Sequence, residues 1–130
     1  MTIIIVGAGQ AAGQAAASLR QEGYEDRIVV IGDEAVPPYQ RPPLSKQYLS
    51  GEHDADKIMV RPAKFYEDRN IELRLGQTVT AINRKEKLVE IADESISYEK
   101  LLISTGSRPR KLNIEGSELG GIFYLRTKAD

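Results

Sequence analysis

The sequence of 130 residues contains no cysteine and no long apolar run. Without cysteine the chain can form no disulfide, no thiolate metal site and no redox-active dithiol. No stretch approaches the roughly 20 apolar residues that a membrane-spanning helix needs. The apolar residues 3–6 follow no basic region and end at Gly7, which excludes an ordinary secretory signal. We therefore expect a soluble, cytoplasmic protein with no membrane contact.

A surplus of charge is also absent. The formal net charge is −1, and the 18 basic residues are dispersed rather than grouped. The six tyrosines and two phenylalanines form no run on which bases could stack. We therefore expect no nucleic-acid partner. The single histidine, His53, has no second ligand near it, so we expect an exposed loop residue and no metal site.

A glycine-rich turn is the most informative feature that is present. The apolar, strand-like residues 2–6 run directly into Gly-Ala-Gly-Gln-Ala-Ala at positions 7–12. Gly7 permits a tight turn, Gly9 lets the backbone approach a pyrophosphate, and Ala12 stands where a third glycine often packs the helix against the strand. The free N–H groups of that helix would face the phosphates. The pattern predicts a dinucleotide site without identifying the dinucleotide.

An acidic pair, Asp33-Glu34, closes the next strand-like run. Asp33 follows Gly13 by about 20 residues, the separation at which a carboxylate usually accepts hydrogen bonds from the ribose hydroxyls. This spacing favours Asp33 as the ribose ligand, with Glu34 as the alternative.

Hydrophobic periodicity predicts an α/β chain in which a parallel sheet is joined to a small antiparallel meander. We expect helices over residues 10–22, 44–50 and 63–69. The sheet strands are expected over residues 2–6, 27–31, 71–75 and 101–104, and the meander strands over residues 78–82, 88–91 and 95–97. Residues 36–43 contain four prolines and are expected to be irregular. The sequence Thr-Lys-Ala-Asp at 127–130 has the form of a capping box that opens a helix, so we expect the chain to continue in its natural context.

Three further segments narrow the interpretation. They are Tyr-Gln-Arg-Pro-Pro-Leu-Ser-Lys at 39–46, Thr-Val-Thr-Ala-Ile at 78–82, and Leu-Leu-Ile-Ser-Thr-Gly-Ser-Arg-Pro-Arg at 101–110. In this order and spacing the chain resembles the FAD-binding N-terminal region of NAD(P)H-dependent ferredoxin reductases. These enzymes, which include putidaredoxin reductase and the reductases of aromatic-ring dioxygenases, belong to the pyridine-nucleotide disulfide oxidoreductase superfamily. The resemblance covers essentially the whole chain.

The resemblance implies a Rossmann-like FAD-binding domain of the glutathione-reductase type, with residues 1–130 as its N-terminal portion. Asp33 would hold the adenosine ribose, the backbone of Val79 would meet the adenine, and Lys46 would lie beside the flavin. Arg126, in the segment Tyr-Leu-Arg, would also contact FAD. The full set of expected cofactor-binding residues is Gly7, Gly9, Ala11, Ala12, Asp33, Glu34, Arg41, Lys46, Val79, Thr105, Gly106 and Arg126.

The implied activity is that of an FAD-dependent ferredoxin–NAD(P)+ reductase. The flavin would take a hydride from NAD(P)H and pass single electrons to a [2Fe-2S] ferredoxin that serves an oxygenase. No side chain is an evident acid, base or nucleophile, so the chemistry would belong to FAD, with Lys46 tuning it. The second glycine-rich fingerprint, which binds NAD(P)H in this family, is absent along with the C-terminal domain. We therefore expect a fragment that is inactive by itself.

Two other interpretations stay open. One is an NAD-binding dehydrogenase domain, which shares the glycine-rich turn but does not explain the meander, the proline-rich Lys46 segment or Thr105-Gly106. The other is a non-catalytic flavin- or nucleotide-binding module that recognises a partner. Arg108 and Arg110 fit either phosphate neutralisation or a solvated basic loop.

Overall fold

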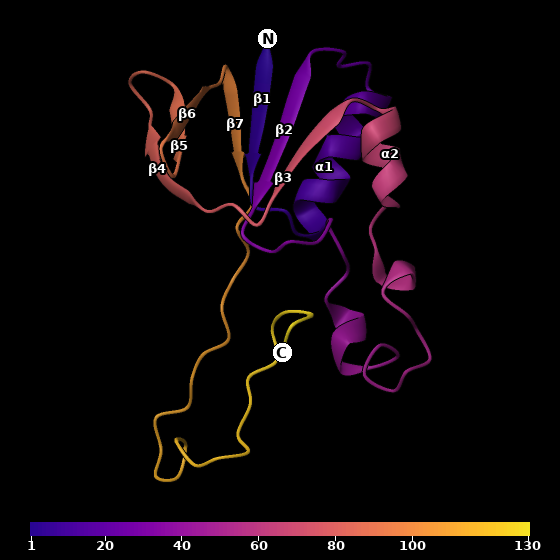
Figure 1. The fold of residues 1–130 in the computed structure, drawn as a ribbon, viewed down its shortest axis with the longest axis vertical. Helices are drawn as coiled ribbons and strands as arrows, with labels where there is room; N and C mark the ends of the chain where they lie inside the picture. The colour runs from indigo at the N-terminus through magenta and orange to yellow at the C-terminus, as the bar shows by residue number, and fades with distance from the viewer.

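The computed structural model describes all 130 residues and contains a four-stranded parallel sheet (Figure 1). Its strand order is β3-β2-β1-β7. The strands are β1 (Thr2–Val6), β2 (Arg27–Gly32), β3 (Ile71–Leu75) and β7 (Lys100–Ile103). All pairs are parallel, with Thr2 opposite Arg27 and Ile3 opposite Lys100. The carboxyl ends of the four strands therefore meet at one edge, where open α/β sheets bind ligands.

Two helices cover one face of this sheet. Helix α1 (Gln10–Gln21) connects β1 to β2, and the short α2 (Ala63–Asp68) precedes β3. Because side chains alternate along a strand, every second residue of β1 and β2 points toward the helices. The resulting core contains Ile3, Ile5, Ala12, Ala16, Ile28, Val30, Tyr66 and Ile71. Neither helix is long and apolar enough to cross a membrane.

The predicted meander covers the opposite face. Strands β4 (Val79–Asn83), β5 (Leu88–Ile91) and β6 (Glu94–Ser97) pair antiparallel in the order β4-β5-β6. Their buried residues Val89, Ile91 and Ile96 pack on Ile4, Val6, Val29 and Ile31 of the parallel sheet. With both faces covered, the central strands β1 and β2 are apolar after their first residue, over Ile3–Val6 and Ile28–Ile31. The α/β architecture is confirmed.

The helix expected over residues 44–50 is wrong. The chain instead forms a 3₁₀ turn, η1 (Pro42–Ser45), followed by non-helical turns, and a second 3₁₀ turn, η2 (Asp56–Ile58). The two prolines fit the start of a helix, but Lys46, at φ −135° and ψ −114°, leaves the helical region. Leu44 is then buried with Tyr39 and Ile58 in a small separate core.

After β7 the chain makes a long excursion away from the sheet and returns at its C-terminus beside the proline-rich segment (Figure 1). The excursion contains no helix or strand, and it exposes six large apolar side chains, Leu112, Ile114, Leu119, Ile122, Phe123 and Leu125. At its end the Asp130 carboxylate accepts a hydrogen bond from Thr127 N, at 2.6 Å, which is one half of the predicted capping box.

His53 lies in a loop, as expected, but it is only partly exposed, and its Nδ1 atom is buried with no hydrogen-bond partner. Its backbone N–H donates to Gln47 O. No group of three or more His, Asp or Glu residues has a metal-binding arrangement.

Candidate functional site

The glycine turn between β1 and α1 is wedged between the ends of β2 and β7. Gly7 has φ +103°, and its N–H donates to Ile31 O at 2.7 Å. A Cβ at Gly7 would overlap the carbonyl oxygen of Ser104, the residue that follows β7. Gly32, at the end of β2, touches Ala8 so closely that a Cβ there would overlap the Ala8 methyl group. Gly7 is therefore required by the fold itself, through its φ and through this contact.

Gly9, the N-cap of α1, is different, because neither its φ nor a close contact requires glycine there. Its φ of −88° suits any residue, and a Cβ added there would meet no protein atom within 4 Å. The missing side chain leaves open space beside the first turn of α1. That turn has no side-chain cap and no acidic residue, and its first three N–H groups donate to no protein acceptor. Open space next to free N–H groups and the positive end of a helix dipole fits a pyrophosphate.

Some of the small residues that follow Gly9 leave room at the start of α1, and others let α1 pack closely on its neighbours. Ala11 is exposed on the side of the helix start, whereas Ala12 is fully buried against the sheet. Gly13 has a packing role that sequence reasoning missed: a Cβ there would lie 2.8 Å from the Pro38 Cβ. In the sequence, the position of Gly13 directly after Ala12 could have indicated this packing role. Gly13 lets the proline-rich segment pack close to α1.

The two carboxylates of the acidic pair have different surroundings: that of Glu34 is bonded to protein groups, and that of Asp33 faces solvent. Glu34 Oε1 forms an ion pair with Arg41 Nη2 at 2.5 Å, and Tyr39 OH donates to Glu34 Oε2 at 2.6 Å. Asp33 is exposed at the end of β2 and has no hydrogen bond or ion pair. Of the two carboxylates, Asp33 is therefore the one left available to a ligand.

Tyr39 lies at the centre of a cluster that the sequence did not reveal. Its hydroxyl donates to Glu34 and accepts from Arg41 Nη1 at 3.0 Å and from Lys128 N at 2.9 Å. Arg41 Nη1 also donates to Arg126 O at 2.6 Å. Burial, followed by the hydrogen bond to Glu34, raises the pKa of Tyr39 to about 12, so its hydroxyl stays protonated at neutral pH.

These contacts bring Arg126 to the end of β7. Its Nη2 atom lies 2.9 Å from where a Gly106 Cβ would be, and Gly106 has φ +74°. Thr105 precedes it, and Ser104 N donates to Val6 O at 2.7 Å, which fixes this string beside the end of β1. The expected neighbours Thr105, Gly106 and Arg126 are thus together, with the guanidinium beside Gly106.

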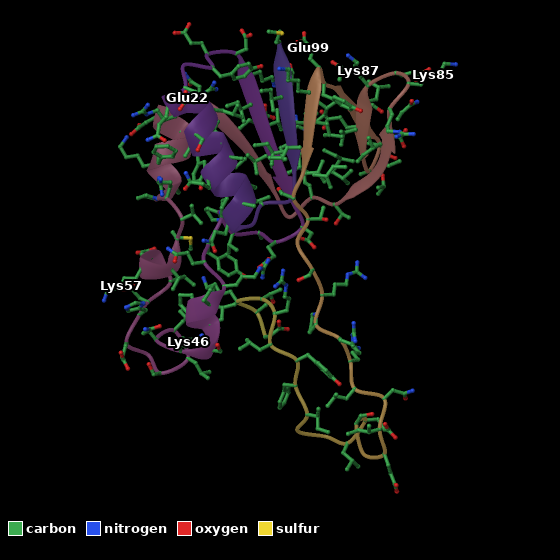
Figure 2. All side chains as sticks on the ribbon, turned by 180° about the vertical axis from the view of Figure 1, so that it is seen from behind. Glu22, Lys46, Lys57, Lys85, Lys87 and Glu99 are labelled. Carbon is green, nitrogen blue, oxygen red and sulfur yellow. The ribbon has the colours of Figure 1, made fainter.

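Val79 and Lys46 lie farther from the turn. The connection from β3 to β4 is anchored at the end of β2, because Gly76 N donates to Glu34 O and Gln77 N to Gly32 O. Val79, the first residue of β4, follows this anchor. Lys46 is exposed on the proline-rich segment, away from the sheet (Figure 2). Its Nζ atom is 3.4 Å from Pro42 O and forms no hydrogen bond with the other expected site residues.

The edge of the sheet thus collects the open space at Gly9 with its free N–H groups, which we call the cradle, together with a free carboxylate and a cation. Arg108 and Arg110 are exposed on the excursion and take no part in it. The cradle at Gly9 fits the pyrophosphate of either FAD or NAD, so the local geometry alone does not choose between them.

Comparison with known proteins identifies the family of this chain. The model of the family "Pyridine nucleotide-disulphide oxidoreductase" matches residues 1–130. Rhodocoxin reductase of Rhodococcus erythropolis is 44% identical over 100% of this chain and 31% of its own length. Rubredoxin-NAD(+) reductase of Pseudomonas putida is 45% identical over 100% of this chain and 34% of its own length. The chain therefore spans about a third of the length of these curated relatives.

Solved structures agree with this result. The ferredoxin reductase of the CYP199A2 system from Rhodopseudomonas palustris superposes with a TM-score of 0.88 at 43% identity. The match covers 97% of this chain and 31% of that structure. The parallel sheet with its small antiparallel partner is thus a fold shared with a ferredoxin reductase. On the match of the family model to the full sequence, this chain belongs to the pyridine nucleotide-disulphide oxidoreductase family.

Proposed function

We propose that this chain is the N-terminal part of the FAD-binding domain of a reductase that carries electrons from NAD(P)H to a small iron–sulfur protein. The observation that carries the proposal is the open cradle at Gly9, where the fold has no need of glycine and three helix N–H groups lack acceptors. The relatives described above are all reductases, which supports the electron-transfer role.

Each end of the cofactor has residues suited to it. The N–H groups of α1 would hold the pyrophosphate, assisted by the guanidinium of Arg126 near Gly106. The free carboxylate of Asp33 would accept hydrogen bonds from the adenosine ribose. The backbone at Val79 would meet the adenine. FAD would supply the chemistry, accepting two electrons together and releasing them singly.

The choice of FAD over NAD rests on the combination of segments. A plain NAD-binding domain accounts for the glycine turn but not for the meander, the proline-rich segment or the Thr105-Gly106 string that approaches Arg126. The relatives are named for different electron acceptors, one for rubredoxin and one for ferredoxin. We propose a [2Fe-2S] ferredoxin of an oxygenase system as the acceptor and the cytoplasm as the location.

The test has two steps, carried out on the full-length protein that contains these residues. Absorbance of the purified protein and mass analysis of the released cofactor identify the dinucleotide, and FAD is the expected result. NADH or NADPH is then added with a [2Fe-2S] ferredoxin or with rubredoxin, and reduction of each acceptor is followed. Bound NAD without flavin would overturn the proposal. If the protein contains flavin but reduces neither acceptor, the electron-transfer role is wrong and the non-catalytic flavin-binding module is the remaining interpretation.

A further inference from the structure

The return of the chain to the site after its excursion depends on very few contacts. Only two hydrogen bonds join residues 105–130 to residues 1–104. One runs from Arg41 Nη1 to Arg126 O at 2.6 Å, and the other from Lys128 N to Tyr39 OH at 2.9 Å. Both involve the Glu34–Tyr39–Arg41 cluster, which we call the clasp. No ion pair adds to them.

The excursion itself cannot set the position of Arg126. Its internal hydrogen bonds are local, apart from one between Leu112 N and Tyr124 OH at 2.9 Å. It has no helix, strand or buried apolar core of its own, and Phe123 is 85% exposed. A segment with so few contacts samples many conformations unless its end is tied down. The clasp provides that tie.

Every hydrogen-bonding position of the Tyr39 hydroxyl is occupied. A phenol has one donor and two acceptor lone pairs. Here the donor goes to Glu34 Oε2, and the lone pairs accept from Arg41 Nη1 and Lys128 N. The ring is only 3% exposed and packs with Leu44 and Ile58, so the hydroxyl is aimed from a fixed position. Glu34 holds the other side of Arg41, which orients the guanidinium toward Arg126 O.

We propose that Tyr39 is a positioning residue for FAD binding: through the clasp it holds the backbone of residues 126–128 so that the Arg126 guanidinium stays beside Gly106 at the cofactor cradle. This inference rests on the proposed function. Tyr39 itself touches no part of the cradle; it acts through Arg126.

The test compares Tyr39→Phe with Tyr98→Phe in the full-length protein. Both changes remove one hydroxyl, but that of Tyr98 makes no hydrogen bond. Hydrogen exchange of the Lys128 amide, measured without FAD, reports on the clasp alone. We expect exchange about tenfold faster in Tyr39→Phe and unchanged in Tyr98→Phe. Unchanged exchange in Tyr39→Phe would show that the clasp does not hold the segment.

FAD affinity reports on the positioning role. We expect Tyr39→Phe to weaken FAD binding about tenfold, or about 1.4 kcal/mol. In an Arg126→Ala background the same change should cost less than about twofold, because the group it positions is already gone. An equal loss in both backgrounds would overturn the positioning role. A wild-type protein that binds no FAD would contradict the proposed function, while the exchange result would still decide on the clasp.

Discussion

At the scale of single residues, the two glycines of the turn have different reasons to be glycine. Gly7 combines positive φ with a close approach to Ser104, so the fold requires it. Gly9 has neither requirement, and we propose that its missing side chain makes room for the cofactor. The sequence motif alone does not separate these two roles. The distinction needs the position of β7, which contacts the turn from about 100 residues downstream.

We expect Gly7→Ala to lower the free energy of unfolding by about 3 kcal/mol, about 1 for the positive φ and about 2 for overlap with Ser104. Gly23→Ala is the matched control, because Gly23 has φ +83° but no atom within 4 Å of an added Cβ. It should lose only about 1 kcal/mol. Urea denaturation measures both. Equal losses would show that contact with Ser104 does not constrain the turn.

Lys46 is the residue whose assignment depends most on the family resemblance. Its ammonium would stabilise negative charge on a reduced flavin, so Lys46→Gln should lower the midpoint potential by about 30 mV, or about 1.4 kcal/mol for two electrons. Lys57→Gln, on the same exposed segment (Figure 2), should leave the potential unchanged. The midpoint potential is measured by redox titration of the FAD-loaded full-length protein. An unchanged or raised potential in Lys46→Gln would show that Lys46 does not stabilise the reduced flavin.

At the scale of elements, strands were predicted better than the proline-rich segment. Ile71–Leu75 and Leu88–Ile91 have the bounds that their alternating side chains predicted. Residues 44–50 have helix formers, but tertiary burial of Leu44 with Tyr39 and Ile58 overrides that preference. The clasp was missed because its partners are 85 and 89 residues apart, and no local pattern encodes such a pairing.

An ion-pair ladder links the two sheets. Glu72 of β3 binds Arg27 of β2 at 2.8 Å and Arg74 at 2.7 Å, and Arg74 binds Glu94 of β6 at 2.6 Å. Burial acts to raise the pKa of Glu72, but the hydrogen bonds from Arg74 and Arg27 outweigh it and lower the pKa below 4.5. The ladder therefore stabilises the fold above about pH 4.5, and this contribution is lost as the pH falls through the lower folded-state pKa.

We expect Glu72→Gln to be less stable than the wild type at pH 7, by no more than about 1 kcal/mol because the pair is partly exposed. The difference should shrink as the pH falls below about 4.5. Glu67→Gln, at an exposed position without an ion pair, is the control. The stability difference is measured from urea unfolding midpoints between pH 7 and below about pH 4.5. A difference between wild type and Glu72→Gln that does not change with pH would rule out the charged ladder as its source.

At the scale of the whole molecule, the sheet has an incomplete side. An open groove of about 390 Å³ lies beside α1 and is lined by apolar residues of β1 and β7, among them Ile3, Ile5 and Leu101. On β7, the outer strand of the sheet, Leu102 is 39% exposed and Ile103 is 60% exposed. In keeping with the proposal that these residues are the N-terminal part of an FAD-binding domain, we propose that other parts of the full-length protein pack on this surface and on the apolar excursion.

We therefore expect residues 1–130 alone to bind FAD at least about tenfold more weakly than the full-length protein, a difference of about 1.4 kcal/mol. The physical reason is that the excursion and the edge of β7 lack the packing that would fix Gly106 and Arg126. Calorimetric titration of both forms with FAD provides the comparison. Equal affinity would mean that no essential contact lies beyond these residues.

We propose that the open space at Gly9 is the pyrophosphate site of FAD, and everything said of the cofactor depends on this. The most direct measurement is FAD affinity of the full-length protein carrying Gly9→Val, compared with Gly120→Val, since both glycines have ordinary φ and no atom within 4 Å of an added Cβ. We predict that Gly9→Val lowers the free energy of unfolding of the apoprotein by no more than about 1 kcal/mol, the usual loss at a helix N-cap, and loses FAD affinity about 100-fold, or about 2.7 kcal/mol, whereas Gly120→Val changes neither. Wild-type FAD affinity in Gly9→Val would contradict the account.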